Sequence, residues 1–132
     1  MIHKAVRKYR SDIDLIVCTY NWGKQPEEER LKLIEALPND VILMATWDMH
    51  HQFKIGEAME TIVDYSLSFE GPGEYFTSEA IAAKKRGMTM HTISNTSGRI
   101  WDFGVIPYEP MPYQWIKRYR AILKAREDLG LR

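Results

Sequence analysis

Three short runs, rich in apolar and β-branched residues, predict strands inside the protein. They span residues 13–19 (IDLIVCT), 41–46 (VILMAT) and 88–93 (MTMHTI). Continuous apolar runs like the first two are typical of strands that a parallel sheet buries on both faces. Residues 65–69 (YSLSF) instead alternate apolar and polar positions, which predicts a half-exposed strand or hairpin arm.

Helical periodicity appears at the start of the chain and again after the first of these runs. Ile2, Val6 and Tyr9 fall on one face of a short helix. Pro26 and the three glutamates after it suit a helix N-terminus, because a proline is tolerated there and acidic side chains are favoured. Pro38 ends that helix, whose apolar stripe is Leu31, Ile34 and Leu37.

Two more helices are predicted in the second half of the chain. Thr77 or Ser78 can cap a helix that runs to about Arg86. Pro112 can start a last helix, with an apolar face made of Trp115, Tyr119, Ile122 and Leu123.

Strands that alternate with helices predict parallel βαβ units and therefore an α/β fold. No linker or repeat divides the sequence, so we expect a single domain over residues 1–132. Two architectures fit, a small doubly wound sandwich and a partial (β/α)8 TIM-type barrel. We favour the partial barrel, with about three parallel core strands, flanking helices and a hairpin-like insert. Each core strand is followed by polar and aromatic residues, and barrel enzymes carry their active sites at that end.

Composition and charge argue against several classes of partner. Lys+Arg and Asp+Glu both number 18, so no basic field is available to hold a nucleic-acid backbone. No apolar run approaches the roughly 18 residues of a membrane span. The basic start of the chain lacks the apolar segment of a secretory signal. We expect no nucleic-acid or membrane partner, and a cytoplasmic location by default.

Cofactor and metal signatures are also missing from the sequence. Residues 69–73 (FEGPG) lack both the dinucleotide-binding spacing and the Lys-Ser/Thr of a P-loop. Asp48, His50, His51 and His91 give no recognised metal-ligand spacing. We therefore predict no cofactor and no metal.

The clusters after the strands combine aromatic rings with hydrogen-bonding side chains, as sugar-binding sites do. A sugar ring stacks its C–H face on an aromatic side chain, while its hydroxyls bond to amide, carboxylate and guanidinium groups. The longest cluster is residues 94–115, a segment that three prolines and two glycines keep from forming one regular element. The predicted sugar-binding residues are Tyr20, Asn21, Trp22, Trp47, Asn95, Arg99 and Trp101.

Three carboxylates in or beside these clusters are candidates for catalysis. Glycoside hydrolysis needs two carboxyl groups across the scissile bond, one of them held protonated. Asp48 directly follows a core strand, Glu70 precedes a Gly-Pro-Gly turn, and Asp102 lies between two aromatic residues. Each also has a purely structural interpretation, as a loop cap or as an acceptor for backbone N–H groups.

Three segments resemble those of a known protein family. They are residues 19–23 (TYNWG), 64–73 (DYSLSFEGPG) and 101–110 (WDFGVIPYEP). They are similar to segments of bacterial glycoside-hydrolase-like (β/α)8 barrel proteins, which are distantly related to family 20 hexosaminidases. The resemblance implies that the chain corresponds to the later part of such a barrel, from the helix before strand five to the helix after strand seven. The Asp-Glu pair that family 20 enzymes use after strand four has no counterpart here.

The sequence therefore predicts a carbohydrate-active protein of the glycoside-hydrolase type, incomplete as this chain alone. Its carboxylates would hydrolyse glycosidic bonds in an aromatic-lined cleft. The alternative is a non-catalytic carbohydrate-binding or assembly module that uses the same aromatic residues. A partial barrel leaves open sheet edges, so we also expect a homo-oligomer, most simply a dimer.

Overall fold

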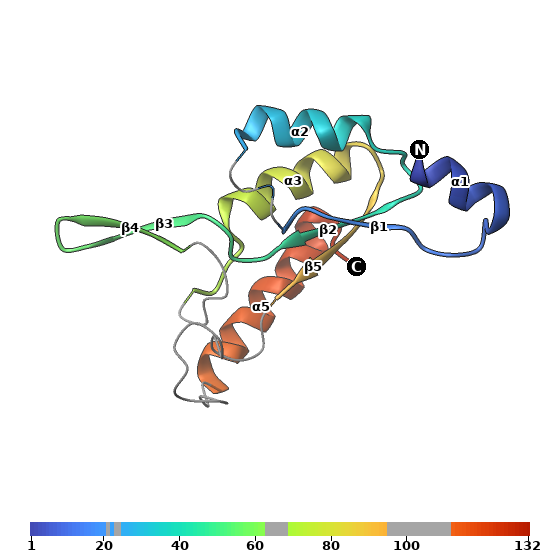
Figure 1. The fold of residues 1–132 in the computed structure, drawn as a ribbon. Coiled ribbons are helices and arrows are strands. Elements are labelled where there is room, and N and C mark those ends of the chain that lie inside the picture. The colour runs from blue at the N-terminus through green and yellow to red at the C-terminus, as the bar shows by residue number, and fades with distance from the viewer. Residues whose placement is uncertain (21, 23–24, 63–68, 95–111) are drawn as a thin grey trace, which may run out of the picture.

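A three-stranded parallel sheet forms the centre of the molecule (Figure 1). The structure is a computed structural model, and it describes residues 1–20, 22, 25–62, 69–94 and 112–132. The strand order is β1 (Ile16–Cys18), β2 (Ile42–Thr46) and β5 (Thr89–Ile93). Both strand pairs are parallel. The expected α/β fold with three parallel strands is confirmed.

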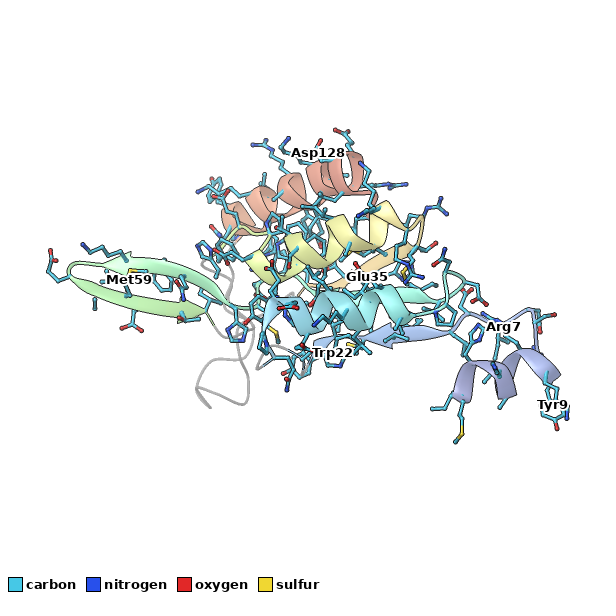
Figure 2. The ribbon with its side chains drawn as sticks, turned by 90° about the horizontal axis from the view of Figure 1, so that it is seen from above. Arg7, Tyr9, Trp22, Glu35, Met59 and Asp128 are labelled. Carbon is cyan, nitrogen blue, oxygen red and sulfur yellow. The ribbon has the colours of Figure 1, made fainter. Side chains whose placement is uncertain are left out.

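Three helices connect or follow these strands. Helix α2 (Glu27–Ala36) joins β1 to β2, α3 (Glu74–Lys85) lies between β2 and β5, and α5 (Pro112–Leu129) follows β5. Figure 2 shows α2, α3 and α5 side by side in that order. All three add side chains to one core cluster with β2 and β5. Helix α1 (Ile2–Tyr9) lies apart from this layer and has no buried residue.

The two faces of the sheet are buried to different extents. Leu43, Ala45 and Met90 are almost completely buried in the core beneath the helices. The alternate positions on β2 and β5, such as Met44 and His91, remain partly exposed. In β1, Ile16 is 52% exposed, and the strand is shorter than residues 13–19. The expectation of a first strand covered on both faces was therefore wrong, because Ile16 lies on the face of the sheet that the helices do not cover.

The sheet is extended beyond β5 by a short contact near the C-terminal end of the chain. Leu131 forms a parallel bridge with Met90, and the Arg132 N–H donates to the Met90 carbonyl oxygen at 2.9 Å. The order around the sheet is thus β1, β2, β5 and then a fourth position that Leu131 occupies. Each step is to the adjacent position, with the same parallel direction.

The last helix begins at Pro112, as predicted, but presents a partly different face to the core. Its buried residues are Arg118 and Ala125, whereas Tyr119 and Leu123 are more than half exposed. The predicted apolar face is therefore right only in part, because Ile122 packs against the core and Trp115 is partly buried, whereas Tyr119 and Leu123 lie outward. The inward face also includes Arg118, whose buried partner, Asp48, follows β2.

Helix α3 also begins earlier than predicted. Gly73 occupies its N-cap position and Glu74 is its first residue. Thr77, one of the two predicted caps, instead donates its hydroxyl to the Gly73 carbonyl oxygen at 2.9 Å, one turn inside the helix.

A two-stranded hairpin projects from the carboxyl end of β2 (Figure 1). Its antiparallel strands are β3 (His51–Ile55) and β4 (Ala58–Ile62), joined at Gly56, which has φ +58°. We expected a hairpin arm at residues 65–69, of which 65–68 lie outside the described residues. Within the described chain, no helix is both long and apolar enough to cross a membrane.

Candidate functional site

The carboxyl ends of the three strands are neighbours at one edge of the sheet, the carboxyl edge. Thr19 and Tyr20 follow β1, Trp47 and Asp48 follow β2, and Ser94 follows β5. The sequence clusters that follow the strands thus begin side by side. The described residues do not include five of the predicted site residues: Asn21, Asn95, Arg99, Trp101 and Asp102.

Trp47 is a core residue in this structure. Its side chain is 0% exposed and packs on Phe76, with ring centroids 4.7 Å apart. Its indole Nε1–H donates to the Glu70 carbonyl oxygen at 2.8 Å. Gly71 is the reason this approach is possible, because a Cβ there would lie 1.9 Å from the indole nitrogen. Trp47 therefore fixes the loop that carries Glu70.

Asp48 is buried in an ion pair with Arg118 of α5. Asp48 Oδ2 lies 3.3 Å from the guanidinium Nη2, and both side chains are 1% exposed. The same Nη2 donates to the Phe69 carbonyl oxygen at 2.7 Å. Burial lowers the pKa of Arg118, and the Asp48 charge opposes that effect. This geometry makes Asp48 the link between β2, the loop after the hairpin and α5.

Glu70 is more accessible than Asp48. Its side chain is 50% exposed, and its carboxylate lies 3.3 Å from the ammonium of Lys117 on α5. An exposed pair of this kind is weakly held and leaves the carboxylate able to exchange its partner for a ligand. Of the two candidate catalytic carboxylates that the structure describes, Asp48 is buried and Glu70 is accessible to solvent.

A second buried ion pair lies near the carboxyl end of β1. No local sequence pattern indicated it, because its two residues are 49 positions apart. Arg30 of α2 donates to Glu79 of α3 at 2.5 Å, and Thr19 donates its hydroxyl to the other Glu79 oxygen at 2.7 Å. Burial raises the pKa of Glu79, while the bonds from Thr19 and Arg30 oppose that rise. The Arg30 guanidinium also stacks on the ring of Tyr75, 3.6 Å from its centroid.

A histidine, His50, also contacts the Tyr75 ring. His50, with φ +59°, stacks its ring on Tyr75 with centroids 4.4 Å apart. Its pKa is lowered by burial and by the charge of Arg30. Both effects favour the neutral form of the His50 ring.

Two buried hydroxyls lie at the carboxyl edge without a hydrogen-bond partner among the described residues. They belong to Thr46, the last residue of β2, and to Ser94, which follows β5. Thr46 is in register with Ile93, which directly precedes Ser94, so the two hydroxyl-bearing residues lie at neighbouring strand ends. Unpaired buried polar groups are costly, and a bound polar ligand is one way in which such groups are satisfied.

Trp22 and Tyr20 are half-buried near the carboxyl edge. Trp22 lies beside α2 (Figure 2) and packs against the core. It borders a hollow of about 460 Å³, whose other described walls are Gln25, Glu29, Arg30, Lys32, Leu33 and Ala36. The hollow is mostly apolar, with a few polar groups at its border, as small-molecule sites usually are.

A second hollow, of about 400 Å³, lies beside the loop that carries Glu70. Its aromatic wall consists of His51 and Phe69, whose rings stack with centroids 3.8 Å apart. Glu74 also lines it, with its carboxylate 3.1 Å from His51 Nδ1. No sequence pattern indicated this pair, because its two rings come from segments 18 residues apart.

No set of three or more His, Cys, Asp or Glu side chains in the described chain is arranged to hold a metal ion. Comparison of the chain with protein-family models, curated proteins and solved structures found no match.

Proposed function

We propose that the chain is a segment of a glycoside-hydrolase-type (β/α)8 barrel that binds carbohydrate at the carboxyl edge of its sheet. The strand order supports the barrel part of this proposal. A doubly wound sheet reverses its order and carries helices on both faces. Here α2, α3 and α5 form one layer, and the order β1, β2, β5, Leu131 does not reverse.

The observation that carries the carbohydrate part is the chemistry of the carboxyl edge. Thr46 and Ser94 have buried hydroxyls without a described partner, and sugar hydroxyls can both donate to and accept from such groups. Tyr20 and Trp22 offer partly exposed aromatic rings at the next strand end, on which a sugar ring can stack. The motif at residues 64–73, which carries the resemblance to glycoside-hydrolase-like proteins, includes Glu70 at this same edge.

For hydrolysis, we assign the two carboxylates different roles. Glu70, whose accessible carboxylate lies 3.3 Å from the Lys117 ammonium, is assigned the nucleophile or general base. Asp102, between two aromatic residues in the sequence, is assigned the general acid. Asp48 acts as a positioning residue, because its pairing with Arg118 holds the Phe69 carbonyl and therefore the loop that presents Glu70.

A panel of 4-nitrophenyl glycosides tests this proposal in solution. We expect release of nitrophenol by the unmodified chain and a loss of roughly 100-fold or more in Glu70→Gln, the range for removing a catalytic acid or base. Asp128→Asn is the matched control, because Asp128 is also about half exposed and ion-paired to a lysine of α5, and it should retain full activity. Equal rates in both variants and the unmodified chain would remove Glu70 from catalysis.

The burial of Asp48 favours a second candidate, a non-catalytic carbohydrate-binding module. In such a protein Asp48 and Arg118 serve only to hold the loop, and Glu70 accepts hydrogen bonds from sugar hydroxyls. This candidate predicts that methyl glycosides change the tryptophan fluorescence, that Trp22→Phe reduces the change, and that no nitrophenyl glycoside is cleaved. Cleavage that depends on Glu70 would exclude it.

A further inference from the structure

Exposed apolar side chains gather on the two flanks of the helix-covered sheet. Among the described residues, thirteen large apolar side chains are exposed. Six belong to the flank formed by α1, β1 and α2, four to α5, two to the hairpin, and only Ile81 to the central helix α3. We call the first group the β1 flank (Met1, Ile2, Tyr9, Ile13, Ile16 and Leu33) and the second the α5 flank (Tyr113, Ile116, Tyr119 and Leu123).

Each flank also borders an open edge of the parallel sheet. Among the described residues, β1 pairs only with β2, and β5 is covered on its outer side only where Leu131 bridges Met90. A hollow of about 350 Å³ lies between this β5 edge and α5, with Met44, His91, Ile122 and Leu123 among its walls. Open strand edges flanked by apolar side chains are usually paired or covered in stable proteins.

We propose that two copies of this chain associate flank to flank, with the β1 flank of each copy against the α5 flank of the other. The two edges run in the same strand direction, so the second copy can continue the sheet without reversing it. Two such contacts, related by a two-fold axis, close the assembly and leave no flank open. Each copy offers four strand positions, counting the one that Leu131 occupies, so the pair reaches the eight positions of a (β/α)8 barrel.

The partly exposed face of the sheet fits the same assembly. Ile16, Ile42, Met44 and Ile93 lie on this face, opposite the helices. The inward face of a closed parallel barrel is filled by layers of such side chains from successive strands. In the proposed pair these residues of both copies face the common interior, which buries them without a second helix layer.

The exposed apolar area is sufficient for a stable pair. Ten exposed side chains on the two flanks, at roughly 100 Å² each, would bury about 1,000 Å² per copy and about 2,000 Å² in the pair. Stable interfaces between proteins bury about 1,200–2,000 Å² in total. This inference rests on the barrel part of the proposed function. The pair would also complete the site, because the carboxyl edges of both copies would form one ring.

The mass of the chain in solution, measured by light scattering after gel filtration, tests the pair directly. We expect twice the 15.5 kDa of one chain. Ile16→Glu on the β1 flank and Leu123→Lys on the α5 flank should each shift the protein to the monomer. Ile81→Lys is the control, because Ile81 is 55% exposed, against 52% and 58% for Ile16 and Leu123, but lies on the central helix. Circular dichroism establishes that each variant is folded.

Mixing the two monomeric variants separates this arrangement from a contact between identical flanks. A mixed pair of Ile16→Glu and Leu123→Lys keeps one flank-to-flank contact intact and brings opposite charges together in the other. We expect dimer to reappear in the mixture, with a mass that neither variant shows alone. A monomeric unmodified chain, or a dimer that only one of the two substitutions disrupts, would overturn the proposal. Neither result depends on sugar binding, so this test is independent of the carbohydrate part of the proposed function.

Discussion

The helix-covered interior and the outlying elements of this protein are held by different forces. Phe76, Leu43 and Ala80 are 0% exposed in the core between the sheet and the helices. The β3–β4 hairpin pairs with itself, and all but three of its ten strand residues are exposed. Isolated two-stranded hairpins are marginally stable in water. The difference shows that the fold depends on the interior, while the outlying elements keep surface free for contacts with other molecules.

Phenylalanine truncation should give the largest difference between the two regions. Phe76→Ala removes a fully buried ring that packs on Trp47 and should lower the free energy of unfolding by about 4 kcal/mol. Phe53→Ala, in the hairpin, should change it by less than about 0.5 kcal/mol. Urea denaturation followed by circular dichroism measures both. Similar losses in the two variants would mean that the hairpin is part of the cooperative core.

Breaking the buried ion pair of Arg30 and Glu79 should give the next largest loss of free energy of unfolding. Arg30→Met leaves an unpaired buried carboxylate and should cost about 3 kcal/mol. The double variant Arg30→Met/Glu79→Leu removes both charges and should be more stable than Arg30→Met alone, because apolar residues can replace a buried pair. A double-mutant cycle from urea denaturation gives the coupling. Additive losses would show that the two charges do not interact.

Two glycines with positive φ allow a smaller comparison with matched backbones. Gly71→Ala forces a methyl group against the Trp47 indole and should cost about 2 kcal/mol. Gly56→Ala, at the hairpin turn, meets no atom within 4 Å, so only the backbone cost of about 1 kcal/mol remains, confined to the hairpin. Thermal unfolding should therefore give a lower melting temperature for Gly71→Ala than for Gly56→Ala. Equal melting temperatures would contradict the close approach of Gly71 to Trp47.

The smallest effect is expected at helix α1, which is attached through exposed side chains. His3 and Arg7 contact the Asp40 carboxylate and lower its pKa to about 2 from an ordinary value of 3.8. Because the pKa is lowered in the folded state, this attachment is complete above about pH 3.8 and is lost as the pH falls towards 2. Hydrogen exchange of residues 2–9 should accelerate in that window while β2 remains protected.

Asp40→Asn provides the control for the acid effect. In this variant the exchange of residues 2–9 should already be fast at pH 5 and should show little further change on acidification. If α1 in the unmodified chain exchanges at a rate independent of pH, apart from the intrinsic chemistry, its attachment does not depend on Asp40.

The sequence predicted the elements with strong local patterns and missed the contacts between distant segments. The apolar run of β2 and the start of α5 at Pro112 follow from local hydrophobicity and from proline geometry. The hairpin was missed because residues 52–63 bury little, so their pattern carried no clear period. The α5 face was predicted only in part, because Arg118 lies inside with Ile122, and its partner Asp48 is 70 residues away.

The candidate site shows the same division. The sequence identified the carboxyl edge correctly as the place where the ends of β1, β2 and β5 meet. It gave no signal that Trp47 is core or that Glu79 pairs with Arg30, because burial and long-range pairing depend on the packed structure. The roles given to Glu70 and Asp102 remain proposals for the kinetic test above.

Carbohydrate binding at the carboxyl edge can be measured by hydrogen exchange with and without sugar. The probes are the methyl glycosides of glucose, galactose, mannose, xylose and N-acetylglucosamine, each added in excess. We expect at least one of them to slow exchange in peptides that contain Tyr20, Thr46 and Glu70. Exchange should stay unchanged in peptides that contain Val41 and Met88, at the opposite edge of the sheet. Unchanged exchange at the carboxyl edge with all five sugars, or equal slowing at both edges, would contradict carbohydrate binding at the carboxyl edge.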